Sequence, residues 1–318
     1  MPFLATAAGD EWVVVPFRVL KEHGGMRLDA YLAQRLHKYS RAHVQRIIDG
    51  GRVTLRGRPA KASGRVACGE TVTVRYPRAE EPPVPHETMP ILYRDDALVV
   101  IDKPGGVLSH PTDKILHNAV TTILTRQLGR KPHLAHRLDR ETSGALVLAL
   151  TPEAARALFE QFVGREVRKE YLAVVFGEVP WRTKTVDAPL GPEGGEIKVR
   201  QKVGEGRPAT TEFARLATDG RLSLVSAKPK TGRLHQIRAH LAHLGHPVVG
   251  DKLYVGRGEA YMKAVRRELL RADLDALGAD RQLLHAWKIA FAHPVTGAKM
   301  NVVAPAPADF PLLPEEGS

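Results

Sequence analysis

The residues best suited to chemistry lie in one segment, residues 136–144, which reads His-Arg-Leu-Asp-Arg-Glu-Thr-Ser-Gly. Asp139 stands there between Arg137 and Arg140, directly before a hydrophobic run that predicts a buried strand. Neighbouring cations keep a carboxyl group ionised, below the usual aspartate pKa of about 3.9. An ionised carboxylate can act as a nucleophile or a base, although by composition alone a structural salt bridge explains it equally well.

A second cluster of functional side chains suggests a metal site. Four histidines lie close together: His235, His240, His243 and His246. No carboxylate or cysteine joins them at ligand spacing, and Arg233 and Arg238 stand among them, where a cation would be repelled. We therefore expect polar packing or RNA contact here, and neither a metal ion nor another cofactor.

Two further catalytic or cofactor patterns are weak. Ser143 lacks the Gly-x-Ser-x-Gly turn that exposes a serine nucleophile. Residues 204–209 have the glycine spacing of a dinucleotide-binding loop, but Pro208 occupies the place where a helix should begin and no acid follows at the right distance. With Cys68 as the single cysteine, the chain can form neither an internal disulfide nor a cysteine-based zinc site.

The elements that must position Asp139 are predicted by hydrophobic patterning. Strands are expected at residues 97–101, 145–150, 171–176 and 222–226, and helices at 152–162, 236–244 and 259–277. The last of these is amphipathic, with Met262, Val265, Leu269 and Ala272 on one face. Strands outnumber helices and occur in hairpin-like pairs, which favours an α+β fold with a mixed, mainly antiparallel sheet flanked by helices and loops.

A smaller module precedes this fold. Leu28, Leu32 and Leu36 recur at helical spacing, and Ser40 is a suitable N-cap for a second helix. Alternating residues at 52–56 and 71–74 then predict short strands.

The charge of this module indicates its partner. The whole chain has a formal net charge of +12, and residues 21–61 alone contain ten Lys or Arg and three acids. Such a balance points to a polyanion, either nucleic acid or an anionic membrane surface. A solvated charged face would have acids to balance it, so we expect RNA.

Composition also places the boundaries. The proline-rich run at 79–86 predicts an extended linker. We expect an N-terminal extension (1–23), an RNA-binding module (24–78), this linker, a catalytic domain (87–310) and a tail (311–318). The first 17 residues fail as a signal peptide, and no apolar run is long enough to cross a bilayer, so a cytoplasmic protein without membrane contact is expected.

With these features in place, the sequence resembles the RluA family of pseudouridine synthases. Residues 136–144 match the family signature His-Arg-Leu-Asp-x-x-Thr-Ser-Gly at every fixed position. Further segments resemble family motifs in the right order: 102–106 (DKPGG), 169–171 (KEY), 231–238 (TGRLHQIR), 245–251 (GHPVVGD) and 284–286 (LHA). The resemblance covers residues 85–306 and implies the pseudouridine synthase fold.

The resemblance also implies roles for single residues. Asp139 would be the catalytic carboxylate, Arg233 its ion-pair partner and Tyr171 an aromatic residue stacked on the target base. Leu284 would form an apolar floor, and Arg137 would fill the gap left by the flipped-out base. The remaining residues expected to contact the substrate are His136, Thr142, His235, Gln236 and Arg238.

Pseudouridine forms when a uracil leaves its ribose, turns and rejoins through carbon. No atom is gained or lost, so the chemistry requires no metal or redox cofactor. Asp139 could attack the sugar, attack the base or remove a proton. Large-subunit ribosomal RNA is the expected substrate, with transfer RNA possible, and a monomer without an obligate protein partner is the default. The alternatives are a non-catalytic RNA-binding or ribosome-assembly factor, and an unrelated hydrolase that uses Asp139.

Residues 26–76 are similar to the alpha-L RNA-binding module first known from a small-subunit ribosomal protein. Its hallmarks are Arg27-Leu28-Asp29 and Ser40-Arg41. The sequence departs from the usual Val-Asn-Gly at residues 55–57 and from Gly-Asp at residues 69–70. The resemblance and the basic face together predict RNA contacts at Arg27, Ser40, Arg41, Arg46 and Arg52.

Overall fold

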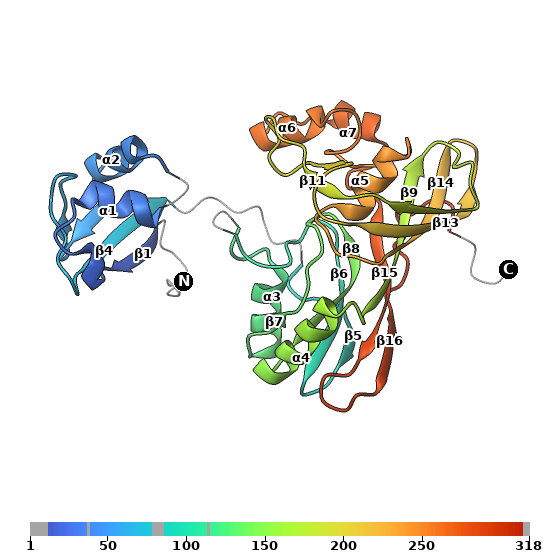
Figure 1. Ribbon diagram of the computed structural model, residues 1–318, viewed down its shortest axis with the longest axis horizontal. Coiled ribbons are helices and arrows are strands. Elements are labelled where there is room, and N and C mark those ends of the chain that lie inside the picture. Colours follow the sequence, from blue (N-terminus) through green and yellow to red (C-terminus); the bar gives the residue numbers. More distant parts are fainter. Residues whose placement is uncertain (1–11, 37–38, 78–85, 113–114, 314–318) are drawn as a thin grey trace. The chain divides into compact units, whose positions relative to one another are not determined.

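The structure is a computed structural model that describes residues 12–36, 39–77, 86–112 and 115–313 (Figure 1). The chain divides into two compact units, residues 1–80 and 81–318. Each unit has its own hydrophobic core.

The N-terminal unit is a four-stranded antiparallel sheet with two α-helices. Its strands run in the order β1 (Trp12–Arg18), β4 (Thr71–Pro77), β2 (Val53–Leu55) and β3 (Arg58–Pro59). Its helices are η1 (Lys21–His23), α1 (Leu28–Arg35) and α2 (Arg41–Asp49). The predicted cap is confirmed, because Ser40 Oγ accepts a hydrogen bond of 3.3 Å from His43 N at the start of α2.

Strand β1 differs from the expected boundary. It lies within residues 1–23, which were expected to be an extension, and it pairs with β4 along its whole length. Phe17 and Val19 bury their side chains in the core of the unit. Pro16 is tolerated because β1 is an edge strand, where a backbone N–H is not required by a second neighbour.

The larger unit is built on a ten-stranded mixed sheet. The order is β10-β13-β14-β9-β15-β8-β6-β5, with β16 paired to β15 and β7 paired to β8. The strands are β5 (Ile91–Arg94), β6 (Leu98–Lys103), β7 (His133–Leu134), β8 (Ser143–Ala149), β9 (Arg168–Phe176), β10 (Thr183–Asp187), β13 (Thr210–Thr218), β14 (Leu222–Pro229), β15 (Leu284–Ala292) and β16 (Lys299–Val303). Neighbours are antiparallel except β8 and β15, which are parallel. The expected α+β class with a mixed, mainly antiparallel sheet is confirmed.

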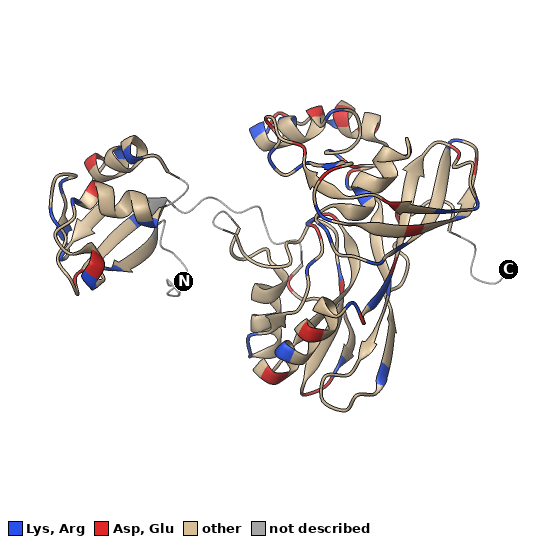
Figure 2. Cartoon of the chain, in the orientation of Figure 1, with Lys and Arg blue, Asp and Glu red and all other residues tan. Residues whose placement is uncertain are grey.

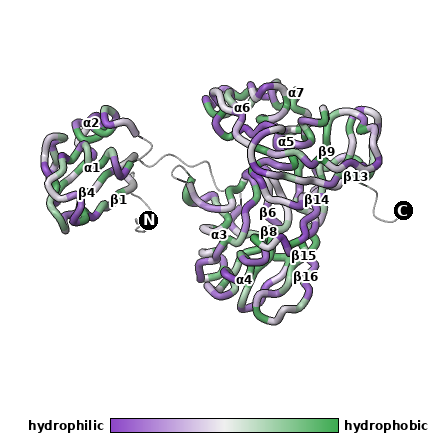
Figure 3. The backbone as a smooth tube through the Cα atoms, in the orientation of Figure 1, coloured by the Kyte–Doolittle hydropathy of each residue, from purple (hydrophilic) through white to green (hydrophobic). Residues whose placement is uncertain are grey.

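Helices and a small sheet surround these strands. They are α3 (Val120–Leu128), α4 (Pro152–Val163), α5 (Gln236–His243), α6 (Glu259–Arg266), α7 (Arg271–Leu277) and the pair β11 (Leu190–Pro192) and β12 (Gln201–Val203). Every residue of β8 is buried, and the hydrophobic residues that form the core are green in Figure 3. None of the helices in the described part of the chain has the length and hydrophobicity needed to cross a membrane.

The prediction of one amphipathic helix over residues 259–277 is wrong. Arg267 takes a left-handed backbone conformation (φ 63°) that ends α6. The Asp273 carboxylate then accepts a hydrogen bond of 2.9 Å from Leu270 N and begins α7. The expected apolar face is not packed, since α6 has no buried residue and Val265 is 61 % exposed.

Candidate active site

Asp139 lies in the loop that enters β8. Its carbonyl oxygen accepts a hydrogen bond of 3.2 Å from Thr142 N, which closes a tight turn. The next carbonyl, that of Arg140, accepts hydrogen bonds from Gly106 N (2.9 Å) and from Lys103 Nζ (3.0 Å). Lys103 is fully buried, and burial lowers the pKa of its ammonium group to about 7. The loop is therefore held from beneath by the end of β6.

Gly144 brings this loop beside β15. Its φ is +106°, and a Cβ atom there would lie 2.3 Å from Ala286 O. Only glycine allows this approach, and it permits the parallel register in which Gly144 faces Ala286. Leu284, at the start of β15, consequently lines the same cavity as Asp139.

The Asp139 carboxylate belongs to a chain of three charged groups. Arg238 Nη1 donates to Asp139 Oδ2 at 2.8 Å. The same guanidinium donates from Nε and Nη2 to the two oxygens of Asp251 at 2.6 and 2.7 Å. Asp251 is fully buried and Arg238 is 8 % exposed, whereas Asp139 is 22 % exposed. The arginine is thus fixed by one carboxylate and presents the other to the cavity.

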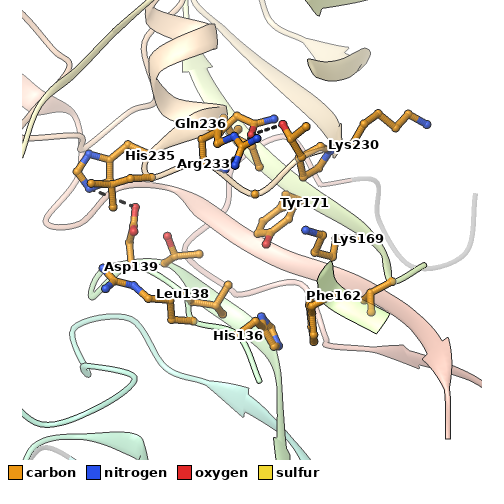
Figure 4. A pocket seen from close by; sticks show the side chains of 18 of the residues that line it. His136, Leu138, Asp139, Phe162, Lys169, Tyr171, Lys230, Arg233, His235 and Gln236 are labelled. Carbon is orange, nitrogen blue, oxygen red and sulfur yellow. Dashed lines mark hydrogen bonds and ion pairs between the residues drawn. The ribbon is translucent and has the colours of Figure 1, made fainter. Parts of the chain in front are cut away.

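The electrostatics favour an ionised Asp139. Burial, the largest single influence, would raise the pKa of its carboxyl group, but the charge of Arg238, its hydrogen bond to Asp139 and the other nearby positive groups together outweigh that penalty and leave the pKa below its usual value. His235 Nε2 lies 3.9 Å from Asp139 Oδ2, a contact that the dashed line between the two side chains marks in Figure 4. Burial and the neighbouring Arg238 lower the pKa of His235 to about 4, so its ring is neutral at pH 7.

These groups open into a cavity of about 780 Å³. Tyr171, from β9, projects into it beside Asp139 (Figure 4). Burial, and then the charge of Asp139, raise the pKa of the Tyr171 hydroxyl, so it stays protonated. Arg137 is exposed at the cavity and, within the part of the chain that the structure describes, forms no hydrogen bond or ion pair. The cavity therefore combines a held carboxylate, an aromatic side chain, an apolar floor at Leu284 and an uncommitted guanidinium.

The residues expected to touch substrate all line this cavity, but several have other partners. Thr142 Oγ1 accepts a hydrogen bond of 2.6 Å from Gln282 Nε2. His136 Nε2 accepts a hydrogen bond of 3.1 Å from Val147 N, and burial lowers the pKa of this ring to about 3. The amide of Gln236 bonds to four groups: Thr210 O, Thr211 Oγ1, Thr231 Oγ1 and Arg233 N. Thr142, His136 and Gln236 therefore form part of the cavity wall, and their polar atoms already hydrogen-bond to other groups of the protein.

The prediction that Arg233 pairs with Asp139 is wrong, because Arg238 occupies that place. Arg233 Nε instead donates to Pro208 O at 3.0 Å. Between the two arginines, His235 takes a left-handed conformation (φ 54°) and α5 begins. This turn sends Arg233 to the wall of the cavity, while Arg238 lies on the buried side of the helix.

Comparison with known proteins identifies this architecture. Residues 97–243 match the RNA pseudouridylate synthase family, and residues 26–72 match the S4 domain. The ribosomal large subunit pseudouridine synthase D of Xanthomonas campestris pv. campestris is 36 % identical over 299 residues, which cover 91 % of this chain and 88 % of the relative. The chain belongs to the RNA pseudouridine synthase family. It is therefore an RNA-modifying isomerase, and the expected resemblance to the RluA family is confirmed.

Two further similarities extend this assignment. The mitochondrial tRNA pseudouridine(32) synthase of Saccharomyces cerevisiae is 39 % identical over 216 residues, which cover 67 % of this pseudouridine synthase and 46 % of the relative. Among solved structures, human RNA pseudouridylate synthase domain containing 1 superimposes with a TM-score of 0.56 and 28 % identity, over 71 % of this chain and 86 % of that one.

Three residues that support the synthase site were given no role at the level of sequence, although Lys103 and Asp251 lie in the matched segments 102–106 and 245–251. Asp251 and Lys103 fix Arg238 and the Asp139 loop, as described above. Tyr254 places its ring 5.2 Å below the Arg238 guanidinium and its hydroxyl 3.4 Å from His235 Nδ1. A lysine that ends a buried strand, as Lys103 ends β6, is a signal that could have been used, because a buried charge must find a partner.

The other sites considered are occupied by structural interactions. Ser143 Oγ lies 2.9 Å from His285 Nδ1 in the interior of the synthase unit. His240 bonds to Thr211 and to the Ala188 carbonyl, and His246 bonds to the Phe176 carbonyl. Three of the four clustered histidines, namely His235, His240 and His246, thus contact different neighbours.

The S4 domain of this synthase carries exposed arginines around one buried acid. Asp29 is fully buried and receives hydrogen bonds from Arg27, Arg41 and Gln45. The side chains of Arg27 and Arg41 remain 45 % and 53 % exposed. Arg46 and Arg52 are also exposed, whereas Ser40 is engaged as the helix cap. Lys and Arg are blue in Figure 2.

Proposed function

We propose that this enzyme isomerises uridine in large-subunit ribosomal RNA and that Asp139 is its catalytic carboxylate. The observation that carries the proposal is the fixed ion pair: Asp139 is held ionised by Arg238, whose other edge is taken by Asp251, and Asp139 alone of the three reaches the cavity to a substantial extent. A preorganised charge of this kind costs no reorganisation when the reaction begins.

The other cavity residues support the same chemistry. A uridine must leave its stack to reach Asp139, at a cost of a few kcal/mol. The uncommitted Arg137 is suited to fill the gap that the base leaves. Tyr171 can stack on the uracil, and Leu284 gives the detached base an apolar surface on which to turn. Enclosure of this kind also keeps water from the broken glycosidic bond.

Two observations support ribosomal RNA as the substrate. The relative that is named for the large ribosomal subunit aligns along nine-tenths of this chain, whereas the relative named for transfer RNA aligns along two-thirds. In addition, the exposed arginines of the N-terminal unit, among them Arg27, Arg41, Arg46 and Arg52, offer phosphate contacts suited to a structured RNA. We propose a monomeric enzyme in which the N-terminal unit, with β1 as part of its sheet, supplies this affinity.

The test is release of tritium from RNA labelled at carbon five of uridine. The native protein should release tritium without changing the mass of the unlabelled RNA, and Asp139→Ala should abolish release. Asp96→Ala, at an exposed acid outside the cavity, is the control and should be as active as the native protein. Full release by Asp139→Ala would refute the catalytic role. No release by the native protein from either ribosomal or transfer RNA would favour a non-catalytic RNA-binding factor.

A further inference from the structure

The cavity extends well beyond Asp139. On the far side of Tyr171 it is lined by Phe162, Val163, Arg165 and Lys169, which we call the distal lobe. The lobe is formed by the end of α4 and the start of β9. Pockets of about 300–1,000 Å³ hold whole small molecules, so a cavity of about 780 Å³ has more room than a single uracil occupies.

Lys169 is an uncompensated cation in this lobe. Its ammonium group lies 6.0 Å from the centre of the Phe162 ring and 3.8 Å from the place a Cβ would take on Gly232. Among the described residues, no carboxylate lies within ion-pair distance of it. Burial lowers the pKa of its ammonium group, because a buried charge without an opposite charge beside it is unfavourable. Figure 4 shows Lys169 between Tyr171 and Phe162, so an anion bound here would lie beside the catalytic pocket.

The lobe also has a rigid apolar shelf. The Phe162 ring is stacked on the His136 ring, with centroids 4.5 Å apart, and His136 is fixed by its hydrogen bond from Val147 N. Val163 continues the shelf and is 65 % exposed, and Phe159, one turn earlier on α4, is 59 % exposed. Flat apolar surface next to a cation is the combination that binds a base together with its phosphate.

Arg165 adds a second cation at a strained position. Its φ is 60°, in the left-handed region that disfavours side chains. Residues kept in such conformations cluster at functional sites. Within the described residues the Arg165 side chain has no ion-pair partner, and it lines the lobe.

We propose that the distal lobe binds the nucleotide next to the target uridine in the same RNA strand, with its phosphate on Lys169 and Arg165 and its base on Phe162 and Val163. This inference rests on the proposed function, because it takes Asp139 as the place of the target. Continuity with the catalytic cavity fixes the occupant as an adjoining nucleotide, and the free cations fix the place of its phosphate.

The experiment separates phosphate from base with three probes: uridine, uridine linked through phosphate to an abasic ribose, and the dinucleotide of two uridines. Binding is measured by calorimetric or NMR titration of the full-length protein carrying Asp139→Asn, so that no turnover occurs. We expect each step along the series to tighten binding, the base by about ten-fold. Lys169→Met should remove the gain from the phosphate, and Val163→Asp the gain from the second base.

Matched substitutions control for general effects. Lys299→Met and Val295→Asp make the same changes at exposed positions outside the cavity and should retain both gains. A dinucleotide that binds no better than uridine would overturn the proposal, as would gains that survive both Lys169→Met and Val163→Asp. Tritium release is scored separately with the protein in which Asp139 is intact. Its absence would refute the proposed activity and leave the binding result to be judged by itself.

Discussion

Asp29 in the N-terminal unit and Asp139 in the larger unit are both held by arginines. In the first case the acid is the more buried member of the ion pair, and in the second case the arginine is. Asp29 is fully buried, and Arg27 and Arg41 lie over it half in solvent. At Asp139 the arginine is the buried member, and the acid reaches the cavity. The first arrangement exposes guanidinium groups, as the proposed RNA contact requires, and the second exposes a carboxylate to the cavity, as the proposed catalytic role requires.

The difference follows from what fixes each arginine. Arg238 is locked by the two hydrogen bonds that it donates to Asp251, and the Asp251 carboxylate in turn accepts hydrogen bonds from Leu253 N and Tyr254 N. Among the described residues, the side chains of Arg27 and Arg41 bond only to the Asp29 carboxylate, and each keeps an open face. A second buried acid thus distinguishes an arginine that supports the proposed catalytic carboxylate from arginines that remain open to the proposed RNA contact. Each prediction below tests one part of this contrast.

The largest difference is expected when the arginine itself is removed. Arg238→Met leaves the buried Asp251 without its ion-pair partner, which should destabilise the larger unit by about 3–5 kcal/mol and reduce activity at least about 100-fold. Arg41→Met should cost at most about 1 kcal/mol, because Asp29 keeps Arg27 and Gln45. Urea unfolding, followed separately for each unit by hydrogen exchange, measures both values. If Arg238→Met and Arg41→Met lowered the free energy of unfolding equally, the proposed difference between the two arginines would be refuted.

The role of Asp251 is tested by a substitution that removes its charge and keeps the size and shape of the side chain. Asp251→Asn can still accept from Leu253 N but no longer fixes the Arg238 guanidinium by charge. We expect kcat to fall about 100-fold with little change in KM, because a misplaced catalytic group affects the transition state more than binding. Asp280→Asn, at an exposed acid paired with Arg271, is the control. A rise in KM with unchanged kcat would contradict a positioning role.

The pH dependence identifies which arginine holds Asp139. With Arg238 present, the pKa of Asp139 is below the usual aspartate value, so activity should stay level as the pH falls from 7 to 5. In Arg238→Gln the penalty of burial is no longer outweighed, and the pKa should rise, so activity should already decline within this range. Arg233→Gln should keep the native profile. If Arg233→Gln shifted the acid limb and Arg238→Gln did not, the assignment made from the geometry would be wrong.

Local sequence predicted the loop of Asp139 well, because its features are local. The Thr142 turn, the close approach at Gly144 and the buried strand that follows all lie within one short segment. The partner of Asp139 was misassigned because Arg233 and Arg238 belong to one motif and are separated only by the turn at His235. Strand β1 was missed because its pairing is not local: its partner β4 lies 53 to 65 residues further along the chain, from Arg18↔Thr71 to Trp12↔Pro77.

A smaller effect is expected from the acid of the N-terminal unit. Asp29→Asn should destabilise that unit by about 1–3 kcal/mol and leave turnover of a short, unstructured RNA unchanged. The pKa of Asp29 is depressed, first by its hydrogen bond from Arg27, so its stabilising contribution is present above the unfolded pKa of about 3.9 and is lost as the pH falls through the folded value. Hydrogen exchange in α1 and β4, measured at pH 7, reports the loss. A fall in turnover of the short RNA would instead assign Asp29 a part in catalysis.

The smallest effect is expected on RNA affinity, from the substitution of one exposed arginine of the N-terminal unit. Arg46 is exposed on α2 and contacts His43 but none of the acids in the described part of the chain, so it is free to meet a phosphate. Arg46→Gln should weaken RNA binding and reduce the slope of log affinity against log salt by about 0.7, the value for one single-strand phosphate contact. Arg156→Gln, at an arginine of the larger unit that is 83 % exposed and paired with Glu160, is the control and should leave the slope unchanged. An equal change in both variants would mean that exposed arginines contribute by net charge alone, and that the open arrangement around Asp29 has no special part in binding RNA.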